Sequence, residues 1–338
     1  MANKRPPTGI RAISTKEGLV EAVNGFRAGC VILSAFELGL FSILGERQLD
    51  AARAAHLAGA DPRACERLLN ALCALGLVTK RGGRFRNAVV ARRYLAAGSR
   101  LFMAGLGHRV SQWRSWGTLS EAVRRGTSVV GRPAARGDES RRRAFIAAMH
   151  ERARLQAPAI VARLDLSRTK RCLDVGAGSG AFAMALARAR PGLRATAYDL
   201  PEILPLTREY VRREGLVHRF DFLAGDFHRG GFGSGFDLVL LSAIVHMNGE
   251  AENRRLILRA AAALNPGGQL VVQDYIMSAD RTRPAAGALF ALNMLVATER
   301  GDSYTAGEIA AWMRAAGLAK IRRIPTPFDA SLLVGWKP

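Results

Sequence analysis

A glycine-rich turn between residues 174 and 180 has the composition of a nucleotide-binding loop. It reads Asp-Val-Gly-Ala-Gly-Ser-Gly and follows a short apolar run typical of a strand. Glycine permits positive φ and lets the backbone approach a ligand where a Cβ would interfere. Asp199 ends the next apolar run, and its carboxylate can accept hydrogen bonds from both hydroxyls of a ribose. Together these residues predict a site for a nucleoside-containing cofactor.

The spacing of the glycines separates two cofactor classes. Dinucleotide sites use GxGxxG and bind a pyrophosphate at a helix N-terminus. Here the pattern is GxGxG, with an acid two residues before the first glycine. This pattern favours S-adenosylmethionine (SAM), whose aminoacyl end replaces the pyrophosphate. The residues expected to bind SAM at this turn and at the end of the next strand are Asp174, Gly176, Gly178, Gly180, Asp199 and Leu200.

Two further positions are expected to complete the chemistry. Asp226 ends the third apolar run, where its carboxylate can accept from an adenine amino group while Phe227 flanks the ring. His246 ends the fourth run, beside the predicted SAM site. An imidazole has a pKa near 6.5 and can remove a hydroxyl proton as oxygen attacks a methyl group in line, a step that depends strongly on positioning. The other histidines (56, 108, 150, 218 and 228) are interpreted as surface or packing residues.

The elements that must position these residues form an alternating pattern from residue 171 onward. Short apolar runs lie about 20–35 residues apart and are separated by helical segments, which predicts an α/β fold with an open, mostly parallel sheet covered on both faces. The runs are RCLDVGAG, LRATAYDL, FDFLAGDF, FDLVLLSAIV and GQLVVQDYI. The final run, ASLLVGWK, is interpreted as an edge strand.

The first hundred residues predict a different, mainly helical unit. Apolar residues recur at helical spacing over 19–44, a short helix is expected near 49–57, and another at 61–76 begins with Asp61-Pro62. Gly82-Gly83 then separates two short strand candidates. Three helices and a hairpin predict a winged helix. The exposed side of its third helix mixes basic, acidic and amide side chains, which favours a protein–protein role over DNA reading.

Four segments are therefore expected. They are an N-terminal extension (1–18), a winged-helix-like domain (19–98), a helical connector (99–168) and the cofactor-binding domain (169–338). The connector holds Trp113 and Trp116, both interpreted as packing residues, and a polar joint near 131–144.

Composition further narrows the class of protein. The chain of 338 residues carries 50 Lys+Arg against 28 Asp+Glu, a net charge of +22, but the basic residues are scattered and mostly Arg. Such a charge speaks to solubility or to an acidic ligand and not to fold. The four cysteines show neither metal-ligand spacing nor a CxxC pair, and no signal peptide is evident. We expect a cytoplasmic protein without metal and without membrane insertion, and nucleic-acid binding is disfavoured.

As a set, these motifs resemble the class I SAM-dependent methyltransferases. More narrowly, residues 19–338 resemble O-methyltransferases of the plant caffeate, acetylserotonin and bacterial antibiotic-tailoring type. The segment LNPGG belongs to the general resemblance, and the segments that carry the narrower one are FELGLFSIL, RACERLLNALCALGLV and GRFRN. The resemblance implies a Rossmann-like domain with a seven-stranded sheet, preceded by an all-helical, winged-helix-like dimerisation domain. It also implies a homodimer and a small-molecule acceptor.

The resemblance assigns roles to further residues. His246 matches the general base, and Asp274 matches the first of two acids that orient it. The second acid falls at Ser303, with Asp302 one residue earlier, so the base is held by Asp274 alone or by Asp274 and Asp302. Ser242 stands where many plant members have a lysine near the cofactor. Met247-Asn248 replaces the Asp-Trp that follows the base in the family.

Four residues are expected to line the acceptor site by the same resemblance. They are Phe145, Met149, Asn293 and Met294, which suit a planar or lipophilic molecule. The main expectation is methyl transfer to a hydroxyl of an aromatic or polyketide-like metabolite. The alternatives are C- or N-methylation, non-methylating SAM chemistry on the same fold, and a winged-helix nucleic-acid binder.

Overall fold

The structure is a computed structural model that describes residues 12–130 and 139–338. These residues form two compact units, one ending at Arg114 and the other beginning at Ser115. The sequence places domain boundaries after residues 98 and 168, and those boundaries stay predictions. Most of the expected extension 1–18 and most of the polar joint lie outside the described residues.

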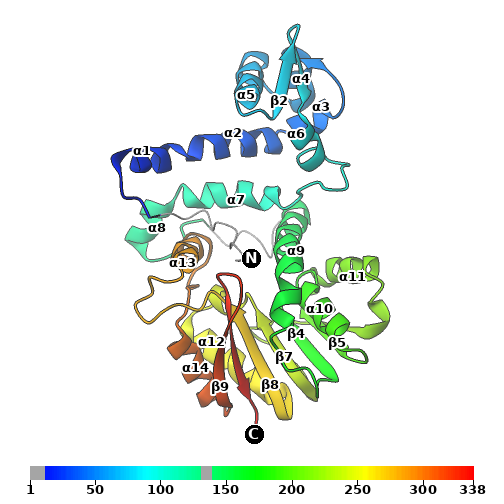
Figure 1. Ribbon diagram of the computed structural model, residues 1–338, viewed down its shortest axis with the longest axis vertical. Coiled ribbons are helices and arrows are strands. Elements are labelled where there is room, and N and C mark those ends of the chain that lie inside the picture. The colour runs from blue at the N-terminus through cyan, green and yellow to red at the C-terminus, as the bar shows by residue number, and fades with distance from the viewer. Residues whose placement is uncertain (1–11, 131–138) are drawn as a thin grey trace, which may run out of the picture. The chain divides into compact units, whose positions relative to one another are not determined.

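The first unit is built of short helices around a small sheet (Figure 1). In chain order its helices are α1 (Lys16–Asn24), α2 (Phe26–Glu37), α3 (Leu40–Leu44), α4 (Ala51–Ala58), α5 (Pro62–Ala74) and α6 (Val89–Tyr94). Its strands are β1 (Leu49–Asp50), β2 (Val78–Arg81) and β3 (Arg84–Asn87), in the antiparallel order β1-β3-β2. Asp50 and Asp61 cap α4 and α5 by accepting hydrogen bonds from backbone N–H groups of the first turn. The winged-helix prediction is confirmed at this level.

Two details of this unit differ from the sequence prediction. The single helix expected over 19–44 is three helices, because the chain breaks at Gly25 and again at Gly39, which adopts φ +69. The unit also has more than the predicted hairpin of two strands, because β1 adds a third strand to the sheet. The pair Leu49–Asp50 is too short to give an alternating pattern in the sequence.

The helices α1 and α2 expose apolar side chains. Leu19, Val23 and Phe26 are each more than half exposed. The stretch Lys16–Glu37 also has the length and composition needed to cross a membrane, which no other helix among the described residues has. A contiguous exposed apolar surface of this kind marks a site of interaction.

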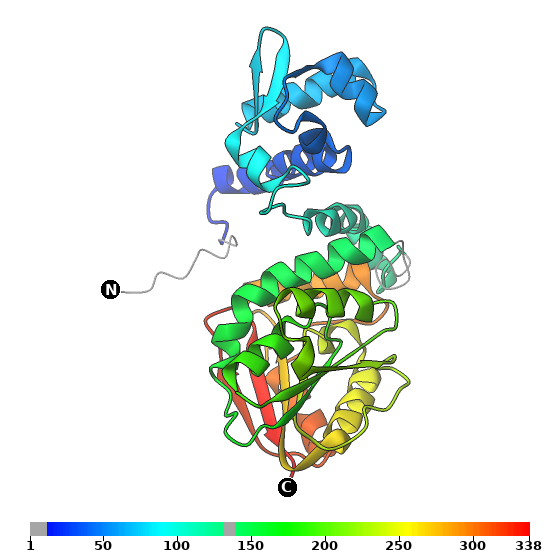
Figure 2. The same ribbon diagram turned by 90° about the vertical axis from the view of Figure 1, so that its right-hand side faces the viewer.

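The second unit is a seven-stranded sheet between two layers of helices (Figures 1 and 2). The strands are β4 (Arg171–Val175), β5 (Arg194–Asp199), β6 (Phe220–Ala224), β7 (Phe236–Ser242), β8 (Leu264–Asp274), β9 (Ala319–Pro325) and β10 (Ser331–Trp336). Their order is β6-β5-β4-β7-β8-β10-β9. The strands from β6 to β8 are parallel, and β10 runs antiparallel to both of its neighbours.

Alternation along the central strands explains why both faces of the sheet are covered. Cys172, Leu238 and Leu240 pack into one apolar core with helices α9 (Glu139–Val161) and α10 (Ala181–Ala189). Their neighbours Leu173, Val239 and Leu241 pack into the other core with α12 (Glu250–Ala263) and α14 (Ala306–Ala315). Successive side chains of a strand point to opposite faces, so both sets are apolar.

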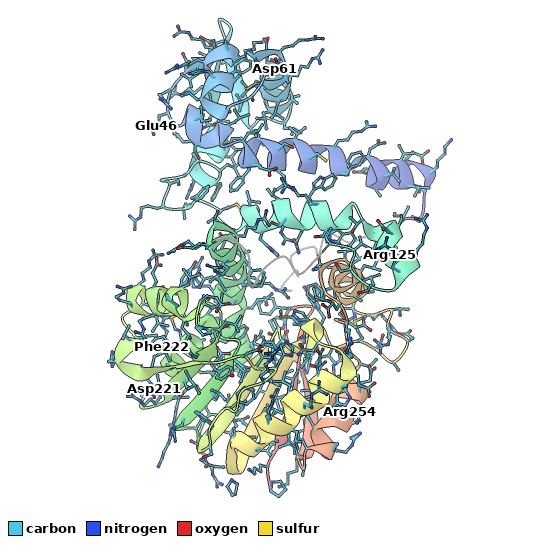
Figure 3. The ribbon with its side chains drawn as sticks, turned by 180° about the vertical axis from the view of Figure 1, so that it is seen from behind. Glu46, Asp61, Arg125, Asp221, Phe222 and Arg254 are labelled. Atoms are coloured by element: carbon cyan, nitrogen blue, oxygen red, sulfur yellow. The ribbon has the colours of Figure 1, made fainter. Side chains whose placement is uncertain are left out.

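The remaining elements of this unit connect or flank the sheet. They are α8 (Leu119–Arg125), α11 (Leu204–Arg213), α13 (Ala285–Ala297) and the 3₁₀ turns η1 (Val217–Arg219) and η2 (Val245–Met247), while α7 (Leu106–Trp116) spans the boundary between the units. The labelled side chains Asp221 on β6 and Arg254 on α12 are exposed at the outside of the unit (Figure 3).

The interpretation of the last run as an edge strand is wrong. β10 lies between β8 and β9, and its side chains from Ser331 to Gly335 are buried. The edge is β9, whose sequence Ala-Lys-Ile-Arg-Arg-Ile-Pro is mostly exposed. Charged residues suit an edge strand because they discourage pairing with other chains, and they also hide the strand from a search for apolar runs.

Candidate active site

The glycine turn has the conformation that its sequence predicts. Gly176, Gly178 and Gly180 all adopt positive φ, and the N–H of Gly176 donates to the carbonyl of Tyr198 at 2.8 Å. A Cβ on Gly176 would lie 2.3 Å from Cδ1 of Ile244, so a larger residue would be strained both by this clash and by the positive φ. Gly180 ends the turn and begins α10. The turn therefore presents bare backbone at the carboxyl end of β4.

Asp199 is tied to this turn. One carboxylate oxygen accepts from the N–H of Gly178 at 2.7 Å and the other from the N–H of Leu200 at 2.8 Å. Each oxygen keeps a lone pair for a hydroxyl of a bound ribose. Burial raises the pKa of Asp199 to about 6, against the effect of the two backbone hydrogen bonds. The adjacent ends of β4 and β5 thus form the two-part cradle that a nucleoside requires.

Asp174 lies beneath the turn and not on its open side. The residue is 2% exposed, and its carboxylate accepts a hydrogen bond from the N–H of Ala183 in the first turn of α10. Burial and the charge of Asp199 raise the pKa of Asp174 to about 7. Its contacts give it a role in holding the turn against the helix, and direct contact with the cofactor stays a prediction.

The loop that carries Asp226 and Phe227 is fixed from behind by a side chain of α12. The guanidinium of Arg259 donates to the carbonyls of Phe227 and His228, the latter at 3.0 Å. The carboxylate of Asp226 accepts from the N–H of His228 at 2.8 Å. A Cβ on Gly225 would lie 2.2 Å from the hydroxyl of Tyr198, so this loop needs glycine to pass over the tyrosine. The expected adenine contacts of Asp226 and Phe227 are compatible with this placement.

Ser242 stands at the end of β7. Its hydroxyl donates to Oε1 of Gln273 on β8 at 2.6 Å. This hydrogen bond joins the two strands just before the segment that carries His246. A contact of Ser242 with the cofactor stays a prediction.

His246 and Asp274 meet across the ends of β7 and β8. Nδ1 of His246 lies 2.9 Å from both carboxylate oxygens of Asp274, and the backbone N–H of His246 donates to the same carboxylate at 3.3 Å. Both side chains are buried, at 11% and 4% exposed. Because a carboxylate only accepts, Nδ1 carries the hydrogen and Nε2 is the basic nitrogen. The ring of Phe290 stands edge-on to the imidazole, with the two ring centroids 4.7 Å apart, and this contact fixes the plane of the imidazole.

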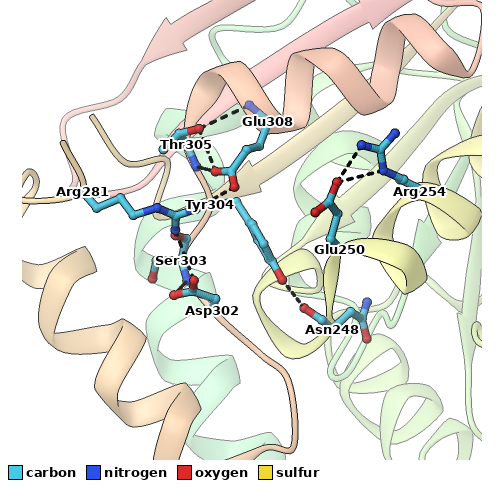
Figure 4. Close-up of polar contacts among 9 residues, drawn as sticks. All are labelled: Asn248, Glu250, Arg254, Arg281, Asp302, Ser303, Tyr304, Thr305 and Glu308. Carbon is cyan, nitrogen blue, oxygen red and sulfur yellow. Dashed lines mark hydrogen bonds and ion pairs between the residues drawn. The ribbon is translucent and has the colours of Figure 1, made fainter. Parts of the chain in front are cut away.

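The carboxylate of Asp302 is hydrogen-bonded to partners other than the imidazole. The backbone N–H of Asp302 donates to the carbonyl of His246 at 3.0 Å, but its carboxylate pairs with Arg281 at 3.1 Å and caps Ser303 (Figure 4). The hydroxyl of Ser303 donates to the carbonyl of Gly287. Of the two arrangements that the sequence leaves open, the geometry favours orientation of the imidazole by Asp274 alone. Asp302 positions the backbone around His246 and not its ring.

The four residues expected to line the acceptor site lie on two helices. Phe145 and Met149 are partly buried on α9, where Phe145 packs beside Ile146, Ile203 and Leu206. Asn293 and Met294 are buried on α13, the helix whose Phe290 contacts the base. The Oδ1 atom of Asn293 accepts from the indole N–H of Trp116 at 2.9 Å, which fixes the orientation of the amide. Acceptor binding by these four residues stays a prediction.

Sequence reasoning missed His150. Nδ1 of this residue lies 2.9 Å from the hydroxyl of Ser179 in the glycine turn, and its ring lies 4.2 Å from that of Tyr210. Burial, reinforced by Arg154, lowers the pKa of His150. The sequence signal that could have revealed His150 is its position next to Met149 on α9. The contact itself depends on the fold, which brings α9 onto the glycine turn.

Comparison with known proteins places these features in a family. The O-methyltransferase domain family matches residues 116–319, and the O-methyltransferase dimerisation domain matches residues 20–97. The chain belongs to the O-methyltransferase family. It is an enzyme of the antibiotic-tailoring type, and its cofactor is SAM.

Among curated relatives, the chain is 34% identical over 329 residues to a 3-hydroxy-5-methyl-1-naphthoate 3-O-methyltransferase of Streptomyces sahachiroi, covering 94% of both chains. It is 31% identical to the tetracenomycin polyketide synthesis 8-O-methyl transferase TcmO of Streptomyces glaucescens, covering 98% of this chain and 99% of the relative. The acetylserotonin O-methyltransferase of Bos taurus is 31% identical, with 93% and 96% covered.

Solved structures show the same relationship. PigF with S-adenosylhomocysteine (SAH) superposes with a TM-score of 0.82 at 27% identity, covering 96% of this chain and all of that chain. Human N-acetylserotonin methyltransferase in complex with SAM gives a TM-score of 0.77 at 27% identity, covering 97% and 99%. The glycine turn, with its positive φ angles and the Asp199 carboxylate behind it, fits a bound SAM.

The first prediction separates the two acids near the base. Asp274→Asn should lower kcat for an accepted substrate by roughly 10- to 100-fold, because the amide oxygen can still accept from Nδ1 but lacks the charge that makes such a hydrogen bond worth about 1.5–3 kcal/mol. Asp302→Asn should stay within about threefold of wild type, since an exposed pair with Arg281 contributes about 0–1 kcal/mol. Steady-state kinetics checks both. Equal losses would show that both acids orient the imidazole.

The second prediction concerns pH. Asp199 is predicted to accept ribose hydroxyls through its ionised carboxylate. Its pKa is raised to about 6, so the protonated form accumulates below pH 6. Affinity for SAH should therefore fall roughly tenfold from pH 7 to pH 5, measured by calorimetry. Asp199→Asn should bind weakly and lose most of this dependence. A wild-type affinity that is flat over this range would contradict the assignment.

The third prediction concerns His150. His150→Ala should weaken SAH binding by roughly fivefold, as expected for loss of one hydrogen bond of about 1 kcal/mol. His150→Asn, which keeps a polar nitrogen near the position of Nδ1, should restore part of the loss. Ser179→Ala should match His150→Ala, and the double variant should be no weaker than either. Additive losses would show that the two side chains act separately.

Proposed function

We propose that the enzyme transfers the methyl group of SAM to a hydroxyl of a small aromatic or polyketide-like metabolite, with His246 as the general base. The observation that carries this proposal is the buried His246–Asp274 pair, which leaves Nε2 as the basic nitrogen beside the cofactor cradle. A group of this kind contributes to catalysis only if it lies within hydrogen-bond reach of the proton that it removes.

The roles of the chain's own residues follow from this arrangement. Bound SAM supplies an electrophilic methyl group. Nε2 of His246 accepts the hydroxyl proton, and the resulting imidazolium is stabilised by the carboxylate of Asp274. Phe290 prevents the ring from turning out of plane. The buried surroundings exclude water, which strengthens the interaction between the two charges.

The residues after His246 do not call for a different reaction. Met247 is exposed, whereas Asn248 is buried. The carbonyl of Asn248 accepts from the hydroxyl of Tyr304 (Figure 4). The amide of Asn248 donates to Asn253 at 3.2 Å. Asn248 therefore joins the end of η2 to α12 and to the segment that precedes α14, and this difference from the family pattern supports the loop instead of altering the base. O-methylation is thus favoured over C- or N-methylation and over non-methylating chemistry.

The acceptor class rests on the site and the relatives. Apolar side chains with one oriented amide, Asn293, suit a flat ring system that carries a few polar groups. Relatives that cover nearly the whole chain are named for a hydroxynaphthoate and for a tetracenomycin polyketide. Both observations support an aromatic, polyketide-like acceptor.

We also propose that the enzyme is a homodimer. The first unit matches the dimerisation domain of the family, and its helices α1 and α2 expose Leu19, Val23 and Phe26. A second copy that covers these side chains would remove an apolar surface from water. The same surface then accounts for the membrane-like composition of Lys16–Glu37 without membrane insertion. A cytoplasmic location stays a prediction.

Nucleic-acid binding by the first unit is disfavoured by its own contacts. Lys80 on β2 pairs with Glu66 at 2.8 Å and contacts Asn70 at 3.1 Å, both on α5. Glu66 and Asn70 are two of the side chains that a DNA-recognition helix would offer to base edges. They are occupied within the protein.

The fourth prediction tests the base. His246→Ala should lower kcat for hydroxyl methylation by roughly 10²- to 10⁴-fold while leaving SAH affinity within about twofold. Labelled SAM with a panel of hydroxylated aromatic acceptors gives the rate, and NMR of the product gives the methylated atom. His218→Ala, which changes an exposed histidine, is the matched control. Unchanged transfer by His246→Ala, or methyl on carbon or nitrogen, would contradict the proposal.

A further inference from the structure

We propose that Arg152 binds a carboxylate of the acceptor and thereby selects aromatic hydroxy acids over neutral phenols. This inference rests on the proposed function and names the substrate class for the same site. The observations that support it are the position of Arg152 on its helix, its contacts, and its place relative to the cofactor cradle.

Helical spacing puts Arg152 on the acceptor side of α9. Phe145, Met149 and Arg152 are separated by four and three residues, which places them on one face of a helix. The first two are the residues expected to line the acceptor site. Arg152 is partly buried, whereas Arg141, Arg143 and Arg154 on the same helix are exposed.

A row of aromatic rings connects Arg152 to the base. The guanidinium carbon lies 5.0 Å from the ring centre of Tyr275. Tyr275 lies 4.8 Å from Phe290, and Phe290 lies 4.7 Å from His246. The rings are tilted against one another, by 42° between Tyr275 and Phe290 and by 89° between Phe290 and His246, and they line an apolar stretch with a basic nitrogen at one end and a fixed positive charge at the other. In the proposed complex a fused-ring acid lies along these rings, with its hydroxyl toward His246 and its carboxylate toward Arg152.

Arg152 also has unused hydrogen-bonding capacity. Within 12–130 and 139–338, its contact with Tyr275 is the one interaction found for its guanidinium, whereas Arg143 pairs with Glu139 and Glu209. A guanidinium presents five N–H donors in a planar fork that matches a carboxylate. Stacking on Tyr275 holds the fork in place at low entropic cost. The residue is therefore prepared for a planar anion.

The position of Arg152 favours the acceptor over the carboxylate of SAM. The cofactor cradle is built at the ends of β4 and β5, on one side of β7. Tyr275 follows β8, on the other side of β7 and His246. On the same helix, His150 contacts the cofactor turn while Arg152 contacts the β8 end. SAM also contains a carboxylate, so the experiment separates the two sources.

The test compares 3-hydroxy-1-naphthoate with 3-hydroxy-1-naphthamide, its neutral counterpart. Binding to SAH-loaded dimer is measured by calorimetry, and methyl transfer is measured separately. Wild type should bind the acid roughly 10- to 100-fold more tightly than the amide. Arg152→Met should abolish this preference by weakening the acid alone, Arg152→Lys should keep part of it, and the matched exposed change Arg141→Met should keep all of it.

Three results would overturn the proposal. One is a wild type that binds neither compound or binds both equally. Another is an Arg152→Met variant that weakens acid and amide alike, which would show a packing role. The last is an Arg152→Met variant that keeps the preference for the acid but binds SAH more weakly. In that case its affinity for 5′-methylthioadenosine, which lacks the carboxylate of SAH, would be unchanged. Selective binding without methyl transfer would support Arg152 while contradicting the proposed function.

Discussion

The hydrogen bond between His246 and Asp274 is the interaction on which the candidate catalytic site depends. It joins the ends of two parallel neighbours, β7 and β8, so it forms only if these strands end at the same level. Their register pairs Ser242 with Gln273, the residue before Asp274, and the side chains of that pair are themselves hydrogen-bonded. Asp274 ends β8 and orients the imidazole, which η2 carries just beyond β7, and this suits a base that must meet a reacting hydroxyl.

Much of this arrangement can be predicted from sequence, because it depends on short-range patterns. The glycines of the turn, Asp199 and His246 each follow an apolar run, and parallel strands bring their carboxyl ends to one edge of a sheet. The seven-stranded, mostly parallel sheet was expected for the same reason, with the family resemblance supplying the number of strands.

The features that the sequence did not predict depend on long-range contacts or on weak local signals. β9 is charged and mostly exposed, so its place at the edge beyond β10 leaves no apolar run. The orientation of Asp302 is set by Arg281, some twenty residues away in the chain, and a sequence gap of that kind says nothing about which partner an acid will choose. His150 looked like a packing residue because its partner, Ser179, lies in a different element.

Helix α9 shows how these pieces combine into a single geometry. Methyl transfer requires cofactor and acceptor to be held at a fixed separation, and small displacements are costly. His150 fastens the helix to the glycine turn at the end of β4, and two residues later Arg152 rests on Tyr275 at the end of β8. One rigid element therefore spans the distance between the cofactor cradle and the acceptor side, with β7 and the base between them. The scattered positive charge of the chain gains a specific role at one position, because the proposed function of Arg152 is to bind an anionic acceptor.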